Sequence, residues 1–233
     1  MATAQQTLIP AQDKSRLKRE FRKHLKTDVT LRFFTQRPSP IAIPGRDCRY
    51  CPQVQQLLEE MTALSPKLTL ETVDFFAEQE KARTDGVSRV PAVLLGMESG
   101  GRVRFYGLPL GYELPVFIDS VKAVSRGVTR LSVNSRKQLR RVNRPVHIQV
   151  FVTPGSEVSA GMALLAHAMA VESRHIVADV IEAEEFPDLV RRYGVRQVPL
   201  TIINEFSTVS GMVGEEEFVE KVLQAGVQQP QES

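Results

Sequence analysis

The sequence predicts an α/β protein built from two copies of one unit, each with the element order β-α-β-α-β-β-α. Segments with the pattern of strands alternate with segments of helical periodicity along the chain. Gly-Val-Ser-Arg-Val-Pro at 86–91 recurs as Gly-Val-Arg-Gln-Val-Pro at 194–199, an offset of 108 residues. Upstream, Arg-Phe-Phe-Thr at 32–35 pairs with Val-Phe-Val-Thr at 150–153 at an offset of 118. Features aligned in the same order favour a duplication over chance.

Both cysteines of the chain lie in the first copy. At the offset of 108 residues, Cys48 falls on Ser156 and Cys51 falls on Ser159. The first copy also has ten extra residues between its first strand and its cysteines, in the proline-rich loop 36–47. We therefore expect equivalent positions in the two copies, with two thiols in one and two serines in the other.

The elements of the first copy follow from periodicity and turn residues. Leu17, Phe21 and Leu25 are four residues apart, which predicts a helix with one apolar stripe. Prolines and glycine interrupt the chain after the first strand and predict a loop. The predicted elements are a helix at 13–26, a strand at 28–35, a loop at 36–47, a helix at 48–63 opening at Cys48, a strand near 69–75, a helix near 76–84, a strand from Ala92, a hairpin turn at Gly100 and Gly101, and a helix near 113–125.

The second copy follows the same order after a basic connecting segment. In that segment, Ser132 or Asn134 could cap a short helix running to about 143, with Leu139 and Val142 facing inward. The later elements are a strand at 146–153, a helix at about 157–172, a strand near 175–181, a helix near 183–192, two strands near 200–213 and a helix near 215–225. The predicted division is an N-terminal unit at 1–126 with the cysteine pair, a basic linker helix at 127–144, and a C-terminal unit at 145–233 without cysteines.

The composition is that of a folded chain. Of its 233 residues, 42% are hydrophobic, which is enough for a sizeable core and excludes a disordered protein. The formal net charge of +3 is uneven: segments 13–26 and 126–144 carry seven basic residues each, while the other 200 residues carry 16 basic and 25 acidic ones. No apolar run reaches the roughly 18 residues of a membrane span, and no signal peptide is recognisable, so we expect a cytoplasmic protein without a membrane partner.

A Cys-x-x-Cys pair at the start of a helix suits thiol–disulfide exchange. The thiolate is the reactive form, and the helix N-terminus stabilises its negative charge. The spacing places the second sulfur one turn along the same face, where it can attack a mixed disulfide formed by the first. We expect Cys48 to be the nucleophile and Cys51 the resolving thiol, with the positive charge of Arg49 lowering the pKa of Cys48.

Two other roles for the cysteine pair are a zinc site and a structural disulfide. A zinc site needs four ligands, and the four histidines form no HxxxH pattern that would complete one, so no metal is expected. The pair could instead be a structural disulfide.

Further stretches resemble one known family. They are the basic N-terminal helix, Cys-Arg-Tyr-Cys at 48–51, Thr-Val-Asp-Phe at 72–75, Arg-Phe-Tyr-Gly-Leu-Pro at 104–109, Gly-Tyr-Glu at 111–113, Val-Ser-Arg-Gly at 124–127, Val-Phe-Val-Thr-Pro at 150–154 and Val-Pro at 198–199. With them the chain resembles, over about residues 13–227, the protein disulfide oxidoreductases, which are glutaredoxin-like proteins with two thioredoxin folds. The resemblance implies two tandem thioredoxin folds, each a central mixed β-sheet flanked by helices, with cis Pro91 and cis Pro199 beside the two site positions.

The same resemblance implies an enzyme that reduces or exchanges protein disulfides in cell redox homeostasis. Tyr50, Val90 and Pro91 would contact the substrate, which is a disulfide-bearing protein. An external reductant, either a thioredoxin reductase-like flavoprotein or glutathione, would recycle the dithiol, and no cofactor is expected. The alternatives are a dithiol electron donor to a peroxidase, and a non-catalytic peptide-binding or holdase module with a structural disulfide.

The second copy departs from the family, whose members usually carry a CxxC in each unit. Serine is close to cysteine in shape but forms neither a thiolate nor a disulfide at neutral pH, so Ser156 and Ser159 predict a redox-inactive site. Together with Val198 and Pro199 they form a vestigial second site that could still bind an extended peptide. Loop 36–47 is longer than the usual connection and would lie over the approach to Cys48, where it either selects substrates or is a tolerated surface insertion.

Segment 13–26 is expected to pack as a helix with a solvated basic face. For both basic segments, contact with an acidic protein partner or with the acidic body of the chain is favoured over nucleic-acid binding. Nucleic acid is not expected as a partner, because Phe21 is the one aromatic residue in these segments.

Overall fold

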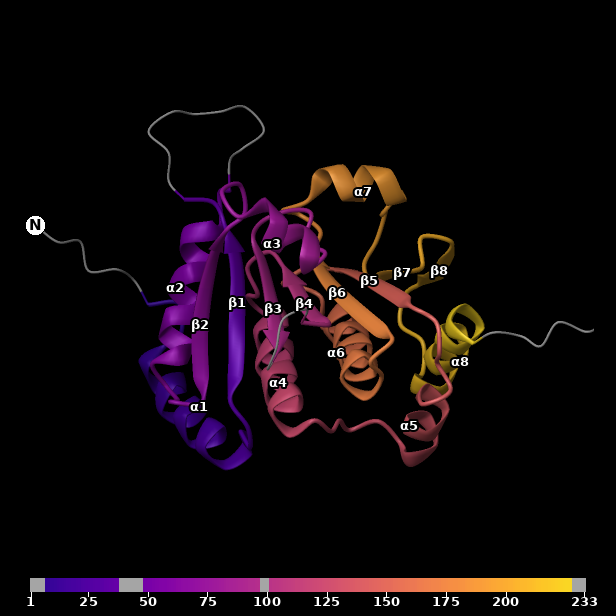
Figure 1. Cartoon of the computed structure of the whole chain (residues 1–233), viewed down its shortest axis with the longest axis horizontal. Helices are drawn as coiled ribbons and strands as arrows, with labels where there is room; N and C mark the ends of the chain where they lie inside the picture. The colour runs from indigo at the N-terminus through magenta and orange to yellow at the C-terminus, as the bar shows by residue number, and fades with distance from the viewer. Residues whose placement is uncertain (1–6, 38–47, 97–100, 228–233) are drawn as a thin grey trace, which may run out of the picture.

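One β-sheet runs through both halves of the chain in the computed structural model, which describes residues 7–37, 48–96 and 101–227 (Figure 1). Its strand order is β2-β1-β3-β4-β6-β5-β7-β8, so the first four strands in the sequence form one half and the last four the other. The strands are β1 (Val29–Thr35), β2 (Leu68–Asp74), β3 (Ala92–Gly96), β4 (Val103–Tyr106), β5 (Val146–Val152), β6 (Ile176–Glu182), β7 (Leu200–Ile203) and β8 (Ser207–Ser210).

The two halves of the sheet have the same pattern of strand directions. In the first, β1 is parallel to β2 and antiparallel to β3, which is antiparallel to β4. In the second, β5 is parallel to β6 and antiparallel to β7, which is antiparallel to β8. The halves join where β4 pairs in parallel with β6, with Phe105 opposite Val180. The predicted α/β fold of two mixed sheets is confirmed, and the sheets are fused.

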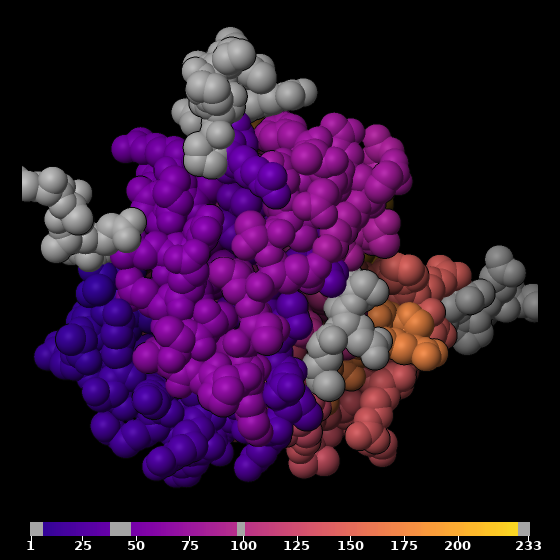
Figure 2. Space-filling model, turned by 60° about the vertical axis from the view of Figure 1, so that its left-hand side comes forward, coloured from indigo at the N-terminus to yellow at the C-terminus, as the bar shows by residue number. Residues whose placement is uncertain are grey.

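Eight helices are described, and they lie on the two faces of this sheet (Figure 1). They are α1 (Ala11–His24), α2 (Cys51–Thr62), α3 (Gln79–Thr84), α4 (Glu113–Arg126), α5 (Val133–Leu139), α6 (Glu157–Glu172), α7 (Pro187–Tyr193) and α8 (Glu215–Gly226). The apolar residues of α3 and α7 pack in a smaller core, and the other helices contribute to a larger one. In the space-filling view of Figure 2 the N-terminal half faces the viewer, and part of the C-terminal half is visible beside it.

The strands divide their side chains between the two cores. Phe33 is fully buried in the larger core and its neighbour Phe34 in the smaller one. Val150 and Phe151 divide in the same way in the second half. Successive side chains of a strand point to opposite faces, so a sheet covered on both sides needs such continuous apolar runs.

Several element boundaries differ from the prediction. The helix predicted near 183–192 starts at Pro187, because proline needs no hydrogen-bond acceptor for its nitrogen in a first helical turn. In the basic connecting segment, Ser132 caps α5 by accepting a hydrogen bond from the Ser135 N–H at 3.1 Å, and Leu139 and Val142 are buried. Most of loop 36–47 and the turn residue Gly100 lie outside the described residues.

Among the described helices, none combines the length and the apolar character that crossing a membrane requires.

Candidate redox site

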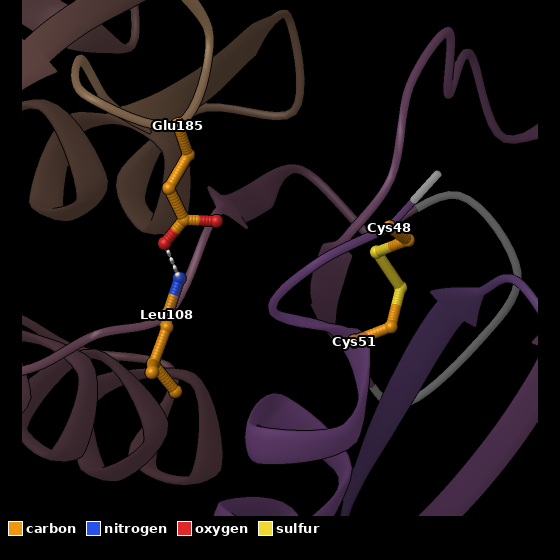
Figure 3. Close-up of a disulfide and its surroundings, with 4 residues drawn as sticks. All are labelled: Cys48, Cys51, Leu108 and Glu185. Carbon is orange, nitrogen blue, oxygen red and sulfur yellow. Dashed lines mark hydrogen bonds between the residues drawn. A yellow bond between two sulfur atoms is a disulfide. The ribbon is translucent and has the colours of Figure 1, made fainter. Parts of the chain in front are cut away.

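Cys48 and Cys51 form a disulfide at the start of α2 (Figure 3). Cys48 is half-buried, whereas Cys51 is only 3% exposed and belongs to the larger core. Cys48 is therefore partly accessible to a reactant in solvent, and the protein covers Cys51. This is the division expected for a nucleophilic and a resolving thiol.

The helix begins at Cys51, three residues later than the prediction that it opens at Cys48. Tyr50 is the residue before the helix, and Cys48 precedes it in a turn closed by a 3.4 Å hydrogen bond from the Cys51 N–H to the Cys48 carbonyl. Pro52 occupies the first turn of the helix, where its missing N–H costs nothing. The N–H groups of the first helical turn still lie next to the disulfide, so the predicted stabilisation of a thiolate does not depend on this shift.

The segment with Val90 and Pro91 lies at the same end of the sheet as the disulfide. Strand β1 ends at Thr35 on the way to Cys48, and β3 begins beside it, with Ala92 paired to Phe34. The Val90–Pro91 peptide bond is cis, as the resemblance implies. Val90 is half-buried and packs against the larger core.

Two further residues predicted for the site flank the disulfide. The first of them, Tyr50, is half-buried like Cys48 and packs against the same core as Cys51. Arg49 is exposed, and its guanidinium carbon lies 5.4 Å from the centre of the Tyr50 ring. Arg49 therefore presents a positive charge to solvent beside the more accessible sulfur.

Contacts from the C-terminal half hold the segments next to Pro91. The carbonyl of Pro91 accepts a hydrogen bond from the Gly107 N–H at 3.1 Å. The next residue, Leu108, donates its N–H to the Glu185 carboxylate at 2.7 Å, which Figure 3 shows beside the disulfide region. Arg89, two residues before Pro91, forms a 2.9 Å ion pair with Asp188. The two halves of the chain thus share the support of one site.

Glu185 belongs to a cluster of three carboxyl groups, with Glu113 and Glu182, that was not predicted from the sequence. Glu113 is 1% exposed, and neither of its carboxyl oxygens has a hydrogen-bond partner among the described residues. Burial and then the charges of Glu182 and Glu185 raise the pKa of Glu113 to about 9. Burial is also the main cause that raises the pKa of Glu185 to about 7. Glu113 therefore carries a proton at neutral pH.

The serine pair of the second half occupies a helix start like that of the cysteines. Ser156 is the N-cap of α6, and its Oγ accepts hydrogen bonds from the Ser159 N–H at 3.2 Å and from the Ser159 hydroxyl at 2.7 Å. The Val198–Pro199 peptide bond is cis, and the Pro199 carbonyl accepts from the Gly211 N–H. The first strand of this half ends just before Ser156, and β7 begins just after Pro199, with Leu200 paired to Phe151. That these four residues form a vestigial site stays a prediction.

Metal ligands do not cluster in the described parts of the chain. No group of three or more His, Cys, Asp or Glu side chains there has the arrangement of a metal site.

Known proteins match the chain in sequence and in fold. A family model described as the thioredoxin domain matches residues 146–224. A curated relative named NADH dehydrogenase, from Ferdinandcohnia aciditolerans, is 22% identical over 163 residues, which are 70% of this chain and 29% of that protein. The chain therefore spans less than a third of that relative.

Two solved structures cover almost the whole chain. A protein disulfide oxidoreductase from Aeropyrum pernix has a TM-score of 0.82 and 25% identity, over 94% of each chain. The alkylhydroperoxide reductase AhpF from Enterococcus faecalis has a TM-score of 0.80 and 22% identity, over 92% of this chain and 99% of that one, and thus shows the same fold. Residues 146–224 thus match a thioredoxin domain, and the whole chain is similar in fold to a protein disulfide oxidoreductase.

Proposed function

We propose that the chain is a thiol–disulfide oxidoreductase that reduces or exchanges protein disulfides through Cys48 and Cys51 alone. One observation carries this proposal: the two sulfurs are joined at the start of α2, with Cys48 half-buried and Cys51 covered. A purely structural disulfide would gain nothing from an accessible sulfur at a helix N-terminus.

The reaction begins from the reduced dithiol. The Cys48 thiolate attacks one sulfur of a substrate disulfide, so that a mixed disulfide forms and one substrate thiolate leaves. The Cys51 thiolate then attacks the Cys48 sulfur, which forms the Cys48–Cys51 disulfide and releases the second substrate thiolate. Two electrons have passed to the substrate, and the released thiolates take up protons from solvent. An external reductant must return two electrons to the pair.

Contacts around the pair favour an extended protein substrate. Val90 and Tyr50 offer half-buried apolar surface at the end of the sheet where Cys48 lies, and the backbone before Pro91 can pair with a substrate strand. We propose that either a thioredoxin reductase-like flavoprotein or glutathione recycles the pair in the cytoplasm, which is the compartment expected from the sequence. Turnover of insulin with each reductant in separate assays identifies which one serves.

Trapping of the mixed disulfide tests the proposal. In Cys51→Ser the resolving thiol is missing, so substrate proteins should accumulate covalently on Cys48 and be released by dithiothreitol. Cys48→Ser should trap nothing and lose insulin reduction. Insulin reduction that survives Cys48→Ser would show that the disulfide is structural and would favour a peptide-binding or holdase module.

A second candidate is a dithiol that donates electrons to a peroxidase. The likeness to the alkylhydroperoxide reductase AhpF over 99% of that chain favours it. An assay that couples NADH or NADPH oxidation to peroxide reduction, with a peroxidase from the same source, separates this role from general disulfide reduction. A rate for the peroxidase far above that for insulin would select the second candidate.

A further inference from the structure

A groove opens between α4, α6 and segment 127–131, at the end of the molecule opposite the disulfide. Strand β4 is antiparallel to β3 and therefore runs in the direction of β1, whose end leads to the site. Helix α4 runs back from that end, so its last residues lie at the other end, where the chain crosses to α5 (Figure 1). A partner bound in this groove would leave Cys48 accessible.

The groove is apolar inside and has about the size of one large side chain. Its volume is about 160 Å³, and Leu131, Leu164, Leu165 and Ala168 contribute to its lining. An apolar cavity of about 150 Å³ is known to hold a benzene ring. The groove therefore fits a side chain such as phenylalanine or leucine.

Charged residues at the groove leave positive charge available. Both acidic lining residues have partners: Asp119 pairs with Lys122 at 2.5 Å, and Glu215 accepts the Ser132 N–H at 2.8 Å. Arg130 is exposed and pairs with no other residue in the described part of the chain. The apolar recess is thus bordered by a guanidinium group that has all its donors free.

The positive charge extends well beyond the groove. The basic end is defined here as the exposed Lys and Arg side chains of residues 18–26 and 126–144, which belong to α1, the crossing segment and α5. Burial and then nearby charges, those of Lys23 and Arg126 among them, lower the pKa of His24 at the end of α1. Helices α1 and α4 are in contact, so the basic residues at their ends lie in one region of the molecule.

We propose that this groove docks a protein segment in which one large apolar side chain is flanked by carboxylates. The apolar side chain enters the recess, and the carboxylates face Arg130 and the basic end around it. A nucleic acid backbone has no such anchor, and Phe21, the one aromatic residue of the two basic segments, is fully buried and cannot stack on bases. A lipid bilayer takes up apolar side chains that protrude, whereas here they are recessed.

Peptide binding tests the proposal without thiol chemistry. The probe is a fluorescein-labelled peptide, Glu-Asp-Glu-Phe-Glu-Asp-Glu, with one control that has glycine for phenylalanine and another that has glutamine and asparagine for the acids. Fluorescence anisotropy is measured on the full chain carrying Cys48→Ser and Cys51→Ser. We expect each control peptide to bind at least tenfold more weakly than the probe. Equal binding of the phenylalanine and glycine peptides overturns the proposal.

Variants at the groove locate the binding. Arg130→Glu should weaken binding of the probe peptide at least tenfold. Ala168→Phe, which fills the recess, should separately have an effect of the same size. Arg174→Glu, a charge reversal at an exposed position outside the lining, should change the affinity for the probe peptide less than threefold. Similar losses for Arg130→Glu and Arg174→Glu overturn the proposal in favour of unspecific attraction. The Arg130 variant keeps the test valid if Ala168→Phe does not fold.

Two further probes address the other macromolecules. Single-stranded oligonucleotides and phosphatidylserine vesicles should bind more weakly than the peptide and should ignore Ala168→Phe. Tighter binding of either one that depends on the groove overturns the proposal. Insulin reduction of the otherwise native Arg130→Glu variant should stay unchanged, so failure of the docking site and failure of the redox proposal are distinguishable.

Discussion

Helices α2 and α6 begin at equivalent places in the two halves, but different bonds hold their first turns. At α2 a disulfide joins Cys48 to Cys51, and the preceding Tyr50 gives no side-chain cap. At α6 the Ser156 Oγ caps the helix and also accepts the Ser159 hydroxyl. The two starts show that one position of this fold can carry either redox chemistry or helix capping.

The surroundings of the two helix starts are otherwise alike. Cys48 and Ser156 are half-buried, while Cys51 and Ser159 are buried. In each half a glycine N–H donates to the carbonyl of the cis proline: Gly107 to Pro91, and Gly211 to Pro199. We therefore expect any difference in redox chemistry between the two halves to rest mainly on the two sulfur atoms.

The largest effect is expected from moving the cysteines to the second half. In a background of Cys48→Ser and Cys51→Ser, the changes Ser156→Cys and Ser159→Cys should create a dithiol with one accessible and one covered sulfur. Insulin reduction should rise at least tenfold above the background. Thiol titration before and after oxidation should show the loss of two thiols.

The single change Ser156→Cys in the same background is the control, because it provides a nucleophile without a resolving thiol. If the double change forms its disulfide but stays at background activity, the second half lacks more than sulfur. The vestigial site would then have lost its substrate contacts as well.

A second difference concerns buried acid next to the serine half. Glu113 follows Tyr112, whose N–H donates to the Pro154 carbonyl two residues before Ser156. The pKa of Glu113 is about 9 in the folded chain, far above the roughly 4.3 of an unfolded one. Between these values the folded state holds a proton that the unfolded state releases, so stability falls as pH rises from about 5 to 9.

We therefore expect the melting temperature of the native chain to fall by several degrees between pH 5.5 and 9. Glu185, whose pKa is raised to about 7, contributes to the lower part of that range. Glu113→Gln should flatten the profile and melt higher than the native chain at pH 9, as differential scanning calorimetry can measure. The exposed Glu157→Gln is the control, and a Glu113→Gln profile parallel to the native one would contradict this account.

Loss of the serine cap should have a smaller effect. Ser156→Ala removes the acceptor for the Ser159 N–H, and losing an N-cap side chain costs about 1 kcal/mol. In a chain of this length that corresponds to a fall of roughly 2–4 °C in melting temperature. Ser156→Thr keeps an acceptor oxygen and should recover most of the loss. Equal melting of the alanine variant and the native chain would show that the hydroxyl pair does not cap the helix.

The fold was predictable from the sequence because its signals are local or repeat. Apolar runs around Phe33 and Phe151 fit strands covered on both faces, and the recurrence of 86–91 at 194–199 places two such units in one chain. The pairing of the two sheets through β4 and β6 was not predicted, because the residues of a strand do not indicate which other strand it pairs with.

The candidate site was predictable only in part. Cys48 and Cys51 are marked by their spacing, whereas the start of α2 at Cys51 depends on the turn around Tyr50. Glu113 and Glu185 are 72 positions apart and meet only where the two halves pack. The acidic run at the end of β6, Glu-Ala-Glu-Glu at 182–185, was the available signal, since acids at the end of a buried strand lie near its covered end.

The smallest effect is expected at the residue after the first cysteine, where the halves differ in sign of charge. Arg49 occupies this position beside Cys48, and Glu157 occupies it beside Ser156. Arg49→Glu should lower the thiolate fraction of reduced Cys48 and slow its alkylation by iodoacetamide at pH 7 about two- to threefold, since exposed charges are well screened by water. Arg49→Gln removes the charge without reversing it, so it should raise the activation free energy of alkylation by about half as much as Arg49→Glu. Measurement at 0.5 M salt separates the causes, because salt weakens the charge interaction but leaves the packing of residue 49 on Tyr50 in place. A slower rate that persists at high salt would assign the effect to packing on Tyr50, and the charge at this position would then not distinguish the two halves.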